Sequence, residues 1–567
     1  AAAAADAAAA ADAAAAADAA ASGAADSAAT ADAEAAATAA TAAATATTDA
    51  AAATATTADT PDETSASSSS PSNPYYTLYS SSSKSAVKDS GPQQRSGAIA
   101  GSPLSLPEIR REFPALGDGA GGWALLENAG GSQVPGCVAD AVRDHMLRSY
   151  VQLGAGYPHS NRATATVERA HEVVKTIMGV VPESEVGGAG GEVILGASTS
   201  ALCAMLAACF DTQVGPGDEV VVHRAGHEAN IGPWVRLAER TGATLVWWRM
   251  GPEGDAAPLT GPEGLRSILT PNTKIVAMCH VSNLLGEVAD VPAAVAAVRE
   301  LAAPGARIAV DGVAFAPHRA MAVSEWGVDF YTFSPYKVYG PHMGALYGSK
   351  AALASITGPN HFFIDPKDAP YKFEVGGVSH EACAAVCAMG GYLRRLATGG
   401  GGGGGGNGEG GGGIGGGGGG GDTGNTQVSQ QGDVDVPPPL TRAEVEAAFG
   451  IMADLEAPLQ EQLMTYFAGL DAKGAIRLIG PKSASNAVRV PTVSFLPLNG
   501  KTTADVVAAA HAAQVAIRDG NMYGVRMLED LGIDAGTGVV RVSLLHYNTP
   551  EEVERLIQAM AGIFPGA

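Results

Sequence analysis

The sequence predicts an α/β fold, with a mostly parallel sheet between two layers of helices and a smaller α/β domain at the C-terminal end. From Leu104 onward, short apolar runs of strand length alternate with longer segments of helical character. This alternation is typical of βαβ units, in which helices join parallel strands. The segments from PTVSFLPL onward repeat the alternation on a smaller scale, which predicts the second domain.

Each predicted strand is a short apolar run. GEVILG (191–196) is a strand and precedes a helix in STSALCAMLAACF. GDEVVVH (217–223) is followed by the helix ANIGPWVRLAERTG and the strand ATLVWWRM. TKIVAMCHVSN (273–283) is followed by the helix PAAVAAVRELAA and the strand ARIAVDGV (306–313). The run WGVDFYTF is a further buried strand. Together these elements form consecutive βαβ units.

Polar residues gather where these strands end. The ends are GASTS, HRAGHEAN, HVSN, DGVAFAPH and SPYK. Ligands of such sheets bind at the carboxyl ends of the strands. We therefore expect a ligand site at this edge of the sheet.

Composition divides the chain into folded and low-complexity parts. Residues 1–103 are mostly Ala, Ser, Thr and Asp without a stripe of large apolar side chains, so we predict a disordered tail. Residues 104–365 are predicted to form a large domain, and residues 366–567 a small C-terminal domain. A glycine-rich insertion at 399–435 is predicted to be disordered and to interrupt the small domain.

Charge and cysteine usage exclude several classes of function. The formal net charge is −23 and no basic cluster opposes it, which argues against a nucleic-acid partner. No apolar stretch is long enough to cross a membrane, so we expect no membrane partner and a cytoplasmic location. The six cysteines include no CxxC pair, so we expect buried reduced thiols, without disulfides or a metal site.

Lys337 lies where a charge is costly. It follows the buried strand WGVDFYTF and has two tyrosines as near neighbours, in SPYKVYG. A lysine at a strand end often only extends its charge into solvent. The functional interpretation is that Lys337 forms a Schiff base with an aldehyde, as pyridoxal phosphate (PLP) requires.

Other strand ends carry residues that suit the same cofactor. Asp311 could keep the pyridine nitrogen protonated. Ser198 and Thr199 open a helix whose N–H groups could bind the phosphate. His227 could stack on the ring and Asn283 could bond its hydroxyl. Each residue alone has an ordinary structural explanation, but together, in this order, they predict a PLP site.

These segments resemble class V aminotransferases of PLP fold type I, in particular the branch of cysteine desulfurases and selenocysteine lyases. The resemblance covers about Ile109 to Phe564, apart from the glycine insertion. It is carried by LENAGGSQVP, AGHEANIGPW, CHVSNLLGEV, SPYKVYGPHMGALYG and VRVSLLHYNTPEEVERL. It implies the PLP-dependent transferase fold type I, with the cofactor bound by the large domain, and a homodimer.

The resemblance implies a role for each matching residue. Lys337 would be the Schiff-base lysine, Asp311 the partner of the pyridine nitrogen and His227 the ring that stacks on the cofactor. Asn283 would bond the cofactor's ring hydroxyl. The residues expected around the phosphate are Ser198, Thr199, Ser334 and Tyr336. Arg541 would bind the α-carboxylate of an amino acid substrate, because a guanidinium binds a carboxylate through two hydrogen bonds.

The chain departs from the family pattern at three places. Ala314 in DGVA replaces a glutamine that helps hold the ring oxygen. Gly377 in EVGG replaces a threonine that reaches the neighbouring subunit's phosphate, although Ser379 is close by. In the loop IRDGNMYGV, Tyr523 stands where a desulfurase places its persulfide-forming cysteine.

The reaction is therefore open within PLP chemistry. The leading interpretation is a lyase that performs β-elimination on an amino acid without a persulfide cysteine. A transaminase or an epimerase of the same family is the alternative. A binding protein on an inactive PLP fold is the non-enzyme alternative, but the presence of Lys337 and Asp311 argues against it. No G-x-G-x-x-G or P-loop pattern follows a strand, which argues against a nucleotide-binding protein.

Overall fold

The computed structural model describes residues 103–117, 121–185, 190–251, 254–399 and 439–565. The predicted tail at 1–103, apart from Pro103, lies outside the described residues. The predicted glycine-rich insertion at 399–435, apart from Gly399, also lies outside them.

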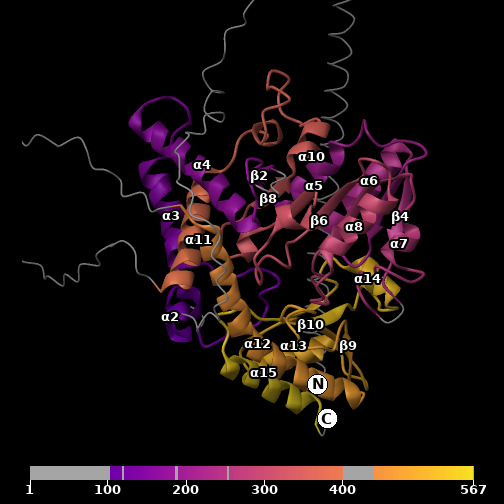
Figure 1. The fold of residues 1–567 in the computed structure, drawn as a ribbon. Helices are drawn as coiled ribbons and strands as arrows, with labels where there is room; N and C mark the ends of the chain where they lie inside the picture. Colours follow the sequence, from indigo (N-terminus) through magenta and orange to yellow (C-terminus); the bar gives the residue numbers. More distant parts are fainter. Residues whose placement is uncertain (1–102, 118–120, 186–189, 252–253, 400–438, 566–567) are drawn as a thin grey trace, which may run out of the picture. The chain divides into compact units, whose positions relative to one another are not determined.

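A central sheet of seven strands forms among the described residues, in the order β2-β8-β7-β6-β5-β3-β4 (Figure 1). Only β8 runs opposite to its neighbours, β2 and β7, and the other pairs in this described sheet are parallel. The strand bounds are β2 Glu192–Gly196, β3 Glu219–His223, β4 Thr244–Trp248, β5 Thr273–Cys279, β6 Arg307–Asp311, β7 Phe330–Phe333 and β8 Gly344–Gly348. The predicted α/β fold class with a mostly parallel sheet is confirmed.

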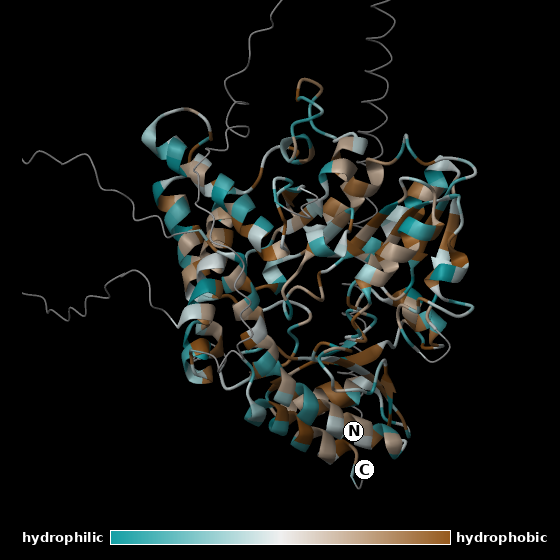
Figure 2. Ribbon diagram, viewed as in Figure 1, coloured by the Kyte–Doolittle hydropathy of each residue, from teal (hydrophilic) through white to brown (hydrophobic). Residues whose placement is uncertain are grey.

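Alternating residues of the buried strands pack against opposite layers of helices. In β3, Val220 and Val222 belong to the core formed with the helices of residues 199–208, 232–241 and 350–355, whereas Val221 belongs to the core formed with the helices of residues 158–178, 291–301 and 380–398. This is the two-residue period of a strand that is buried on both faces. In Figure 2 the covering helices carry both hydrophobic and hydrophilic residues, as expected for helices with one face in the core and one face in water.

The helices of this part of the chain, with the short 3-10 helices labelled η, follow in chain order. Their bounds are α2 Leu106–Arg111, η1 Pro114–Leu116, α3 Gly136–Arg148, α4 Pro158–Met178, α5 Thr199–Ala208, η3 Glu228–Asn230, α6 Gly232–Thr241, α7 Leu265–Ile268, α8 Val291–Leu301, α9 Val323–Trp326, η4 Pro335–Lys337, α10 Lys350–Ser355, η5 Tyr371–Phe373 and α11 His380–Thr398.

A second core forms around an antiparallel sheet in the order β12-β13-β10-β9. Its helices and strands are α12 Arg442–Ala472, β9 Ile476–Ile479, β10 Thr492–Pro497, α13 Thr503–Ala512, β12 Arg518–Gly520, α14 Val525–Asp530, β13 Val539–Ser543 and α15 Pro550–Ile563. A short parallel pair, β1 Ala124–Leu125 with β11 Val515–Ala516, attaches an N-terminal segment to this domain.

The long helix α12 belongs to both cores. Its first half, with Val445 and Met452, packs in the core of the central sheet, and its second half, with Leu463 and Phe467, packs in the core of the smaller sheet. Helix α11 packs entirely with the central sheet's core. This packing favours a boundary between the two domains within α12. The sequence predicts a boundary between residues 365 and 366, and these domain bounds stay a prediction.

Within the described ranges, no helix is both long and apolar enough to cross a membrane. The cytoplasmic location inferred from the sequence stays a prediction.

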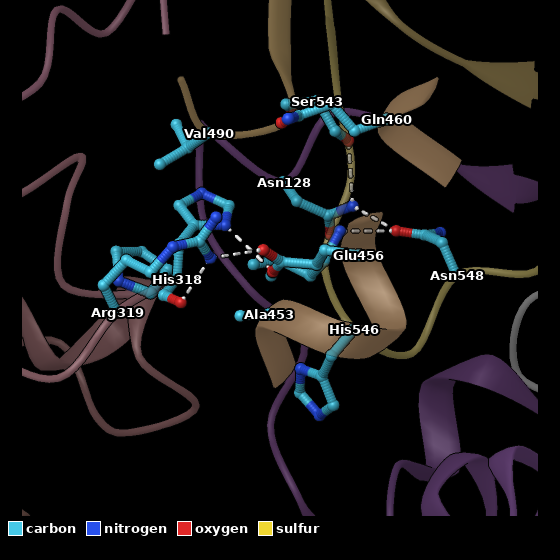
Figure 3. A network of polar contacts seen from close by, with 12 residues as sticks. Asn128, His318, Arg319, Ala453, Glu456, Gln460, Val490, Ser543, His546 and Asn548 are labelled. Carbon is cyan, nitrogen blue, oxygen red and sulfur yellow. Dashed lines mark hydrogen bonds and ion pairs between the residues drawn. The ribbon is translucent and has the colours of Figure 1, made fainter. Parts of the chain in front are cut away.

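A buried ionic cluster ties α12 to the loop that follows β6 (Figure 3). The carboxylate of Glu456, which is fully buried, lies 2.9 Å from His318 Nδ1 and 3.2 Å from Arg319 Nη1. Arg319 Nη1 also donates to the carbonyl oxygen of His318. The loop that carries His318 and Arg319 begins directly after Asp311, so the cluster joins α12 to the predicted site.

Replacing Glu456 with alanine should destabilise the protein by about 3–5 kcal/mol, because it leaves the mostly buried Arg319 without its counter-charge. Thermal unfolding of the purified variant and wild type measures this loss of stability. The matched control is Glu446→Ala on the same helix, whose carboxylate is 56% exposed and pairs with Arg442 one turn away. That change should cost only about 0.5 kcal/mol. Equal losses in the two variants would contradict a stabilising role for the buried cluster.

Candidate functional site

The predicted residues at the carboxyl ends of β3, β5, β6 and β7 meet in one pocket, together with the start of α5. The pocket is lined by Thr199, Ser200, His227, Ala229, Val281, Asn283, Asp311, Val313, Ala314, Ser334, Tyr336 and Lys337. Eight candidate residues were named for cofactor binding, and seven of them line this pocket. Only Ser198 does not.

Lys337 ends η4, directly after β7. Its backbone N–H donates to Ser334 O, and two residues later Tyr339 adopts a left-handed conformation (φ 63°), held by a hydrogen bond from its hydroxyl to Pro317 O. The side chain is buried, and within the described ranges its amine makes no hydrogen bond or ion pair. Burial, with help from the charge of Arg541, lowers the pKa of Lys337 to about 8, although Asp311 opposes the shift. A buried lysine of this kind can act as a nucleophile or a base.

Asp311 is the last residue of β6, which lies between β5 and β7 in the sheet. Its carboxylate accepts a hydrogen bond from the N–H of Val313 at 2.9 Å. Burial raises the pKa of Asp311 above its ordinary value, and the bond from Val313 and the charge of Lys337 oppose that shift. A buried carboxylate with a single backbone donor favours a cationic partner inside the pocket.

The hydroxyl groups near the start of α5 differ in whether they are free to bind a ligand. Ser198 caps α5 by accepting the N–H of Ala201, which explains why it does not line the pocket. Thr199 Oγ1 donates to Phe333 O and lies 2.7 Å from Ser334 Oγ, so the start of α5 is fixed to the end of β7. Gly344 of β8 allows this closeness, because a Cβ there would lie 2.4 Å from Thr199 N. The exposed Ser200 is the additional hydroxyl at this end of the pocket.

His227 has a fixed tautomer. Its Nδ1 accepts the N–H of Ala229 at 3.0 Å, so the proton of the neutral ring lies on Nε2. Burial and the nearby charges of Lys337 and Arg541 lower the pKa of His227 to about 4. The imidazole is therefore neutral at physiological pH. A neutral ring on the wall of the pocket can stack on another ring.

Asn283 and Arg541 connect the pocket to the C-terminal domain. The amide of Asn283 donates one hydrogen bond to Met522 O at 2.9 Å, which leaves its second N–H for a ligand. Arg541, on β13, donates from Nη1 to Asn283 O at 3.2 Å. Its side chain is buried, and its Nε has no partner among the described residues. Arg541 does not line the pocket itself, but its charge acts on both Lys337 and His227.

Five lining residues are not among the candidates: Ser200, Ala229, Val281, Val313 and Ala314, the last of which the sequence marks only as a departure from the family pattern. Each of the first four stands next to, or two positions from, a candidate, so proximity in the sequence could have identified them. The aromatic ring of Tyr336 stacks on His342, with centroids 4.7 Å apart, and Lys337 Nζ lies over the same ring, 5.8 Å from its centroid. Tyr336 thus links the pocket lining to His342.

None of the six cysteines lines the pocket, and all six are described residues. Cys383 and Cys387 lie on α11, where burial raises the pKa of both thiols, to about 12 for Cys387. Burial also raises the pKa of the thiols of Cys203 and Cys279. These four thiols are therefore in the unreactive protonated form at neutral pH.

The residues of this pocket fit pyridoxal 5′-phosphate. The amine of Lys337 makes no hydrogen bond or ion pair within the described residues and suits an aldehyde, and the carboxylate of Asp311 suits a protonated ring nitrogen. The N-terminus of the ten-residue helix α5, with hydroxyl groups beside it, suits a phosphate. The neutral ring of His227 suits the face of an aromatic cofactor.

The chain matches the family described as Aminotransferase class-V over residues 124–399 and 446–556. Among curated proteins, it is 36% identical to the aminotransferase-like protein FGM3 of Gibberella zeae over 82% of this chain and 99% of that protein. It is 27% identical to the cysteine desulfurase-like protein ustD of Aspergillus flavus over 79% of this chain and 88% of that protein.

Solved structures share the fold. The cysteine desulfurase CsdA of Escherichia coli superimposes with a TM-score of 0.60 at 22% identity, over 81% of this chain and 98% of that one. A cysteine desulfurase of Thermococcus onnurineus superimposes with a TM-score of 0.63 at 20% identity, over 81% of this chain and 98% of that one. At these identities the likeness establishes the fold, which is that of PLP-dependent transferases of fold type I.

Proposed function

The chain belongs to the class-V aminotransferase family of PLP-dependent enzymes, and on that premise we propose that it is a lyase that eliminates a β-substituent from an amino acid without an enzyme-bound persulfide. The observation that carries this proposal is the make-up of the pocket. It brings Lys337, Asp311 and His227 together, and the lining residues include no cysteine.

When bound, PLP supplies an electron sink for the negative charge that develops at the substrate's α-carbon. The roles proposed for this chain follow from its side chains. Lys337 would hold the cofactor covalently and, when the substrate replaces it, move the proton at the α-carbon, a task that suits an amine with a lowered pKa. Asp311 would keep a proton on the ring nitrogen, and His227 would hold the ring from one face.

Arg541 would bind the substrate's α-carboxylate. It is buried at the boundary between the central sheet and the C-terminal domain, and its unpartnered Nε is a free donor. A guanidinium with free donors in a dry environment binds a carboxylate strongly and in one orientation. This orientation would direct the α-carbon toward Lys337. A homodimer, implied by the family resemblance, stays a prediction.

The proposal that sulfur does not pass through the protein rests on the thiols. A persulfide forms by attack of a thiolate, which must reach the substrate. The cysteines on α11 are held in a helix with raised thiol pKa values, and the loop closest to His227 offers Tyr523 instead. A phenol cannot carry a persulfide.

The experiment that tests the function is incubation of the purified holoenzyme with a panel of amino acids that includes cysteine and selenocysteine. We expect release of a keto acid and ammonia together with sulfide or selenide, an unchanged visible cofactor band, and no sulfur adduct on any cysteine by mass spectrometry. Conversion of the cofactor to its amine form would instead establish a transaminase. A sulfur adduct on Cys383 or Cys387 that rises and falls with turnover would establish a desulfurase.

A further inference from the structure

A short turn of the C-terminal domain contacts the pocket residues Asn283 and His227 and has an unusual backbone. Between β12 and α14, Met522 and Tyr523 both have positive φ angles, 46° and 59°. Residues with a Cβ rarely adopt this left-handed conformation, and two in succession are rarer still. Such backbone strain persists only where neighbouring contacts enforce it, and it is concentrated at functional sites.

The contacts that hold this conformation come from the turn itself, where the N–H of Gly524 donates to Asn521 O at 2.8 Å, and from segments that end two strands of the central sheet. Asn283, a pocket residue, donates its side-chain N–H to Met522 O at 2.9 Å. The N–H of Glu228, next to His227, donates to Tyr523 O at 2.9 Å. The N–H of Tyr523 donates to Asn521 Oδ1 at 3.0 Å. Each carbonyl of the strained pair is thus held by a residue at the end of a different strand of the central sheet.

Ion pairs fix the helix that follows the turn. Arg526 on α14 binds the carboxylate of Glu228 through two hydrogen bonds, of 2.9 and 3.1 Å. Arg224, after β3, binds the carboxylate of Asp530 at 2.9 Å. The side chain of Met522 is buried in a small core with Met527 and Leu528 of the same helix. The turn is therefore attached rigidly to the central sheet.

This arrangement determines where the aromatic ring of Tyr523 lies. Tyr523 is 68% exposed, so its side chain gains little from burial. Its ring lies against the imidazole of His227, with centroids 4.9 Å apart and planes inclined by 31°. The strained turn does not bury the tyrosine; it places the phenol ring on a pocket residue whose backbone neighbour, Glu228, holds the turn.

We infer that Tyr523 is a positioning residue, which holds the imidazole of His227 in place on the wall of the cofactor pocket. The inference rests on the proposed function only in that His227 is taken to contact the cofactor. With the Nδ1 of His227 bonded to Ala229 and one side of the ring against Tyr523, the imidazole has little freedom to tilt. The hydroxyl of Tyr523 has no part in this role, because the contact is between the rings.

The test compares variants of the full-length protein by cofactor affinity, turnover and thermal stability. In Tyr523→Gly the left-handed turn is relaxed and the ring is lost, so the melting temperature should stay equal or rise. Because an aromatic pair contributes a modest free energy, PLP affinity measured on apoprotein should fall by about three- to tenfold. Turnover with the best substrate of the panel should fall at least as much. Tyr523→Phe should match the wild type in all three measurements.

Two further variants complete the design. Tyr523→Asn removes the ring but tolerates the left-handed backbone, and should reproduce the affinity loss if Tyr523→Gly does not fold. Gln514→Gly relaxes a left-handed residue (φ 56°) in an exposed turn away from the pocket, and should change stability without changing PLP affinity. Unchanged PLP affinity in Tyr523→Gly or Tyr523→Asn, or a loss in Tyr523→Phe equal to theirs, would overturn the inference. Because PLP affinity is measured on apoprotein, it decides this inference even if the panel yields no lyase activity.

Discussion

Lys337→Ala is expected to abolish both turnover and covalent attachment of PLP. The amine of Lys337 is part of the pocket lining and makes no hydrogen bond or ion pair with the described residues, so it is available to a ligand. Its loss removes the nucleophile for the cofactor and the base for the α-proton together. A positioned acid or base alone contributes about 10²–10⁴ in rate, and so we expect a decrease of at least about 10³.

The measurement is reduction of the holoenzyme with borohydride followed by peptide mass spectrometry. In the wild type the cofactor should be found on Lys337, and in Lys337→Ala on no residue. Lys350→Ala is the matched control, because Lys350 is an exposed lysine that pairs with Glu183 on the surface. A variant without Lys337 that still holds the cofactor covalently would disprove the assignment.

The same residue predicts a pH dependence of cofactor loading. Only the neutral amine can attack a carbonyl, and the pKa of Lys337 is lowered to about 8 by burial. The rate of attachment to apoprotein should therefore rise with pH, have its midpoint near pH 8 and level off above it. An ordinary lysine would have its midpoint near 10.4.

Asp311→Asn has the second largest expected effect. The asparagine has the shape of the aspartate and can still accept the N–H of Val313, so the strand end and the pocket should stay intact. Without the carboxylate, the ring nitrogen loses the negative partner that keeps it protonated. Removing a pre-oriented electrostatic group from an active site typically costs about 10²–10³ in rate.

The visible cofactor band and the turnover rate are measured on the same Asp311→Asn preparation. We expect the band to persist while the rate falls. Rate and band lost together would indicate that Asp311 serves only to bind the cofactor, and an unchanged rate would eliminate its proposed role.

The sequence predicted the parallel sheet because the buried strands have continuous apolar centres, such as residues 220–222 of β3, that leave little choice of structure. It also predicted that the polar residues directly after such runs lie together at one edge of the sheet. The meeting of His227, Asn283, Asp311 and Lys337 in one pocket agrees with this expectation.

The remainder depends on contacts that a sequence does not encode locally. Ser198 looked equivalent to Thr199, but the helix uses its hydroxyl as a cap. An apolar stripe on α11 does not say which of two cores will cover it, and so the bounds of the two domains stay a prediction. The backbone of Tyr523 could not be predicted, because the contacts on the carbonyls of Met522 and Tyr523 come from residues that are roughly 240–300 positions away in the chain.

The membership of α12 in two cores also affects how the protein folds and unfolds. A helix of 31 residues with one half in each core cannot lose its packing in one domain without exposing apolar residues at its junction with the other. The two domains therefore share a cooperative unit, and their melting should be coupled into one calorimetric transition instead of two. During synthesis, the core of the central sheet is incomplete until α12 has left the ribosome. The N-terminal domain is therefore not expected to reach a stable state before that point.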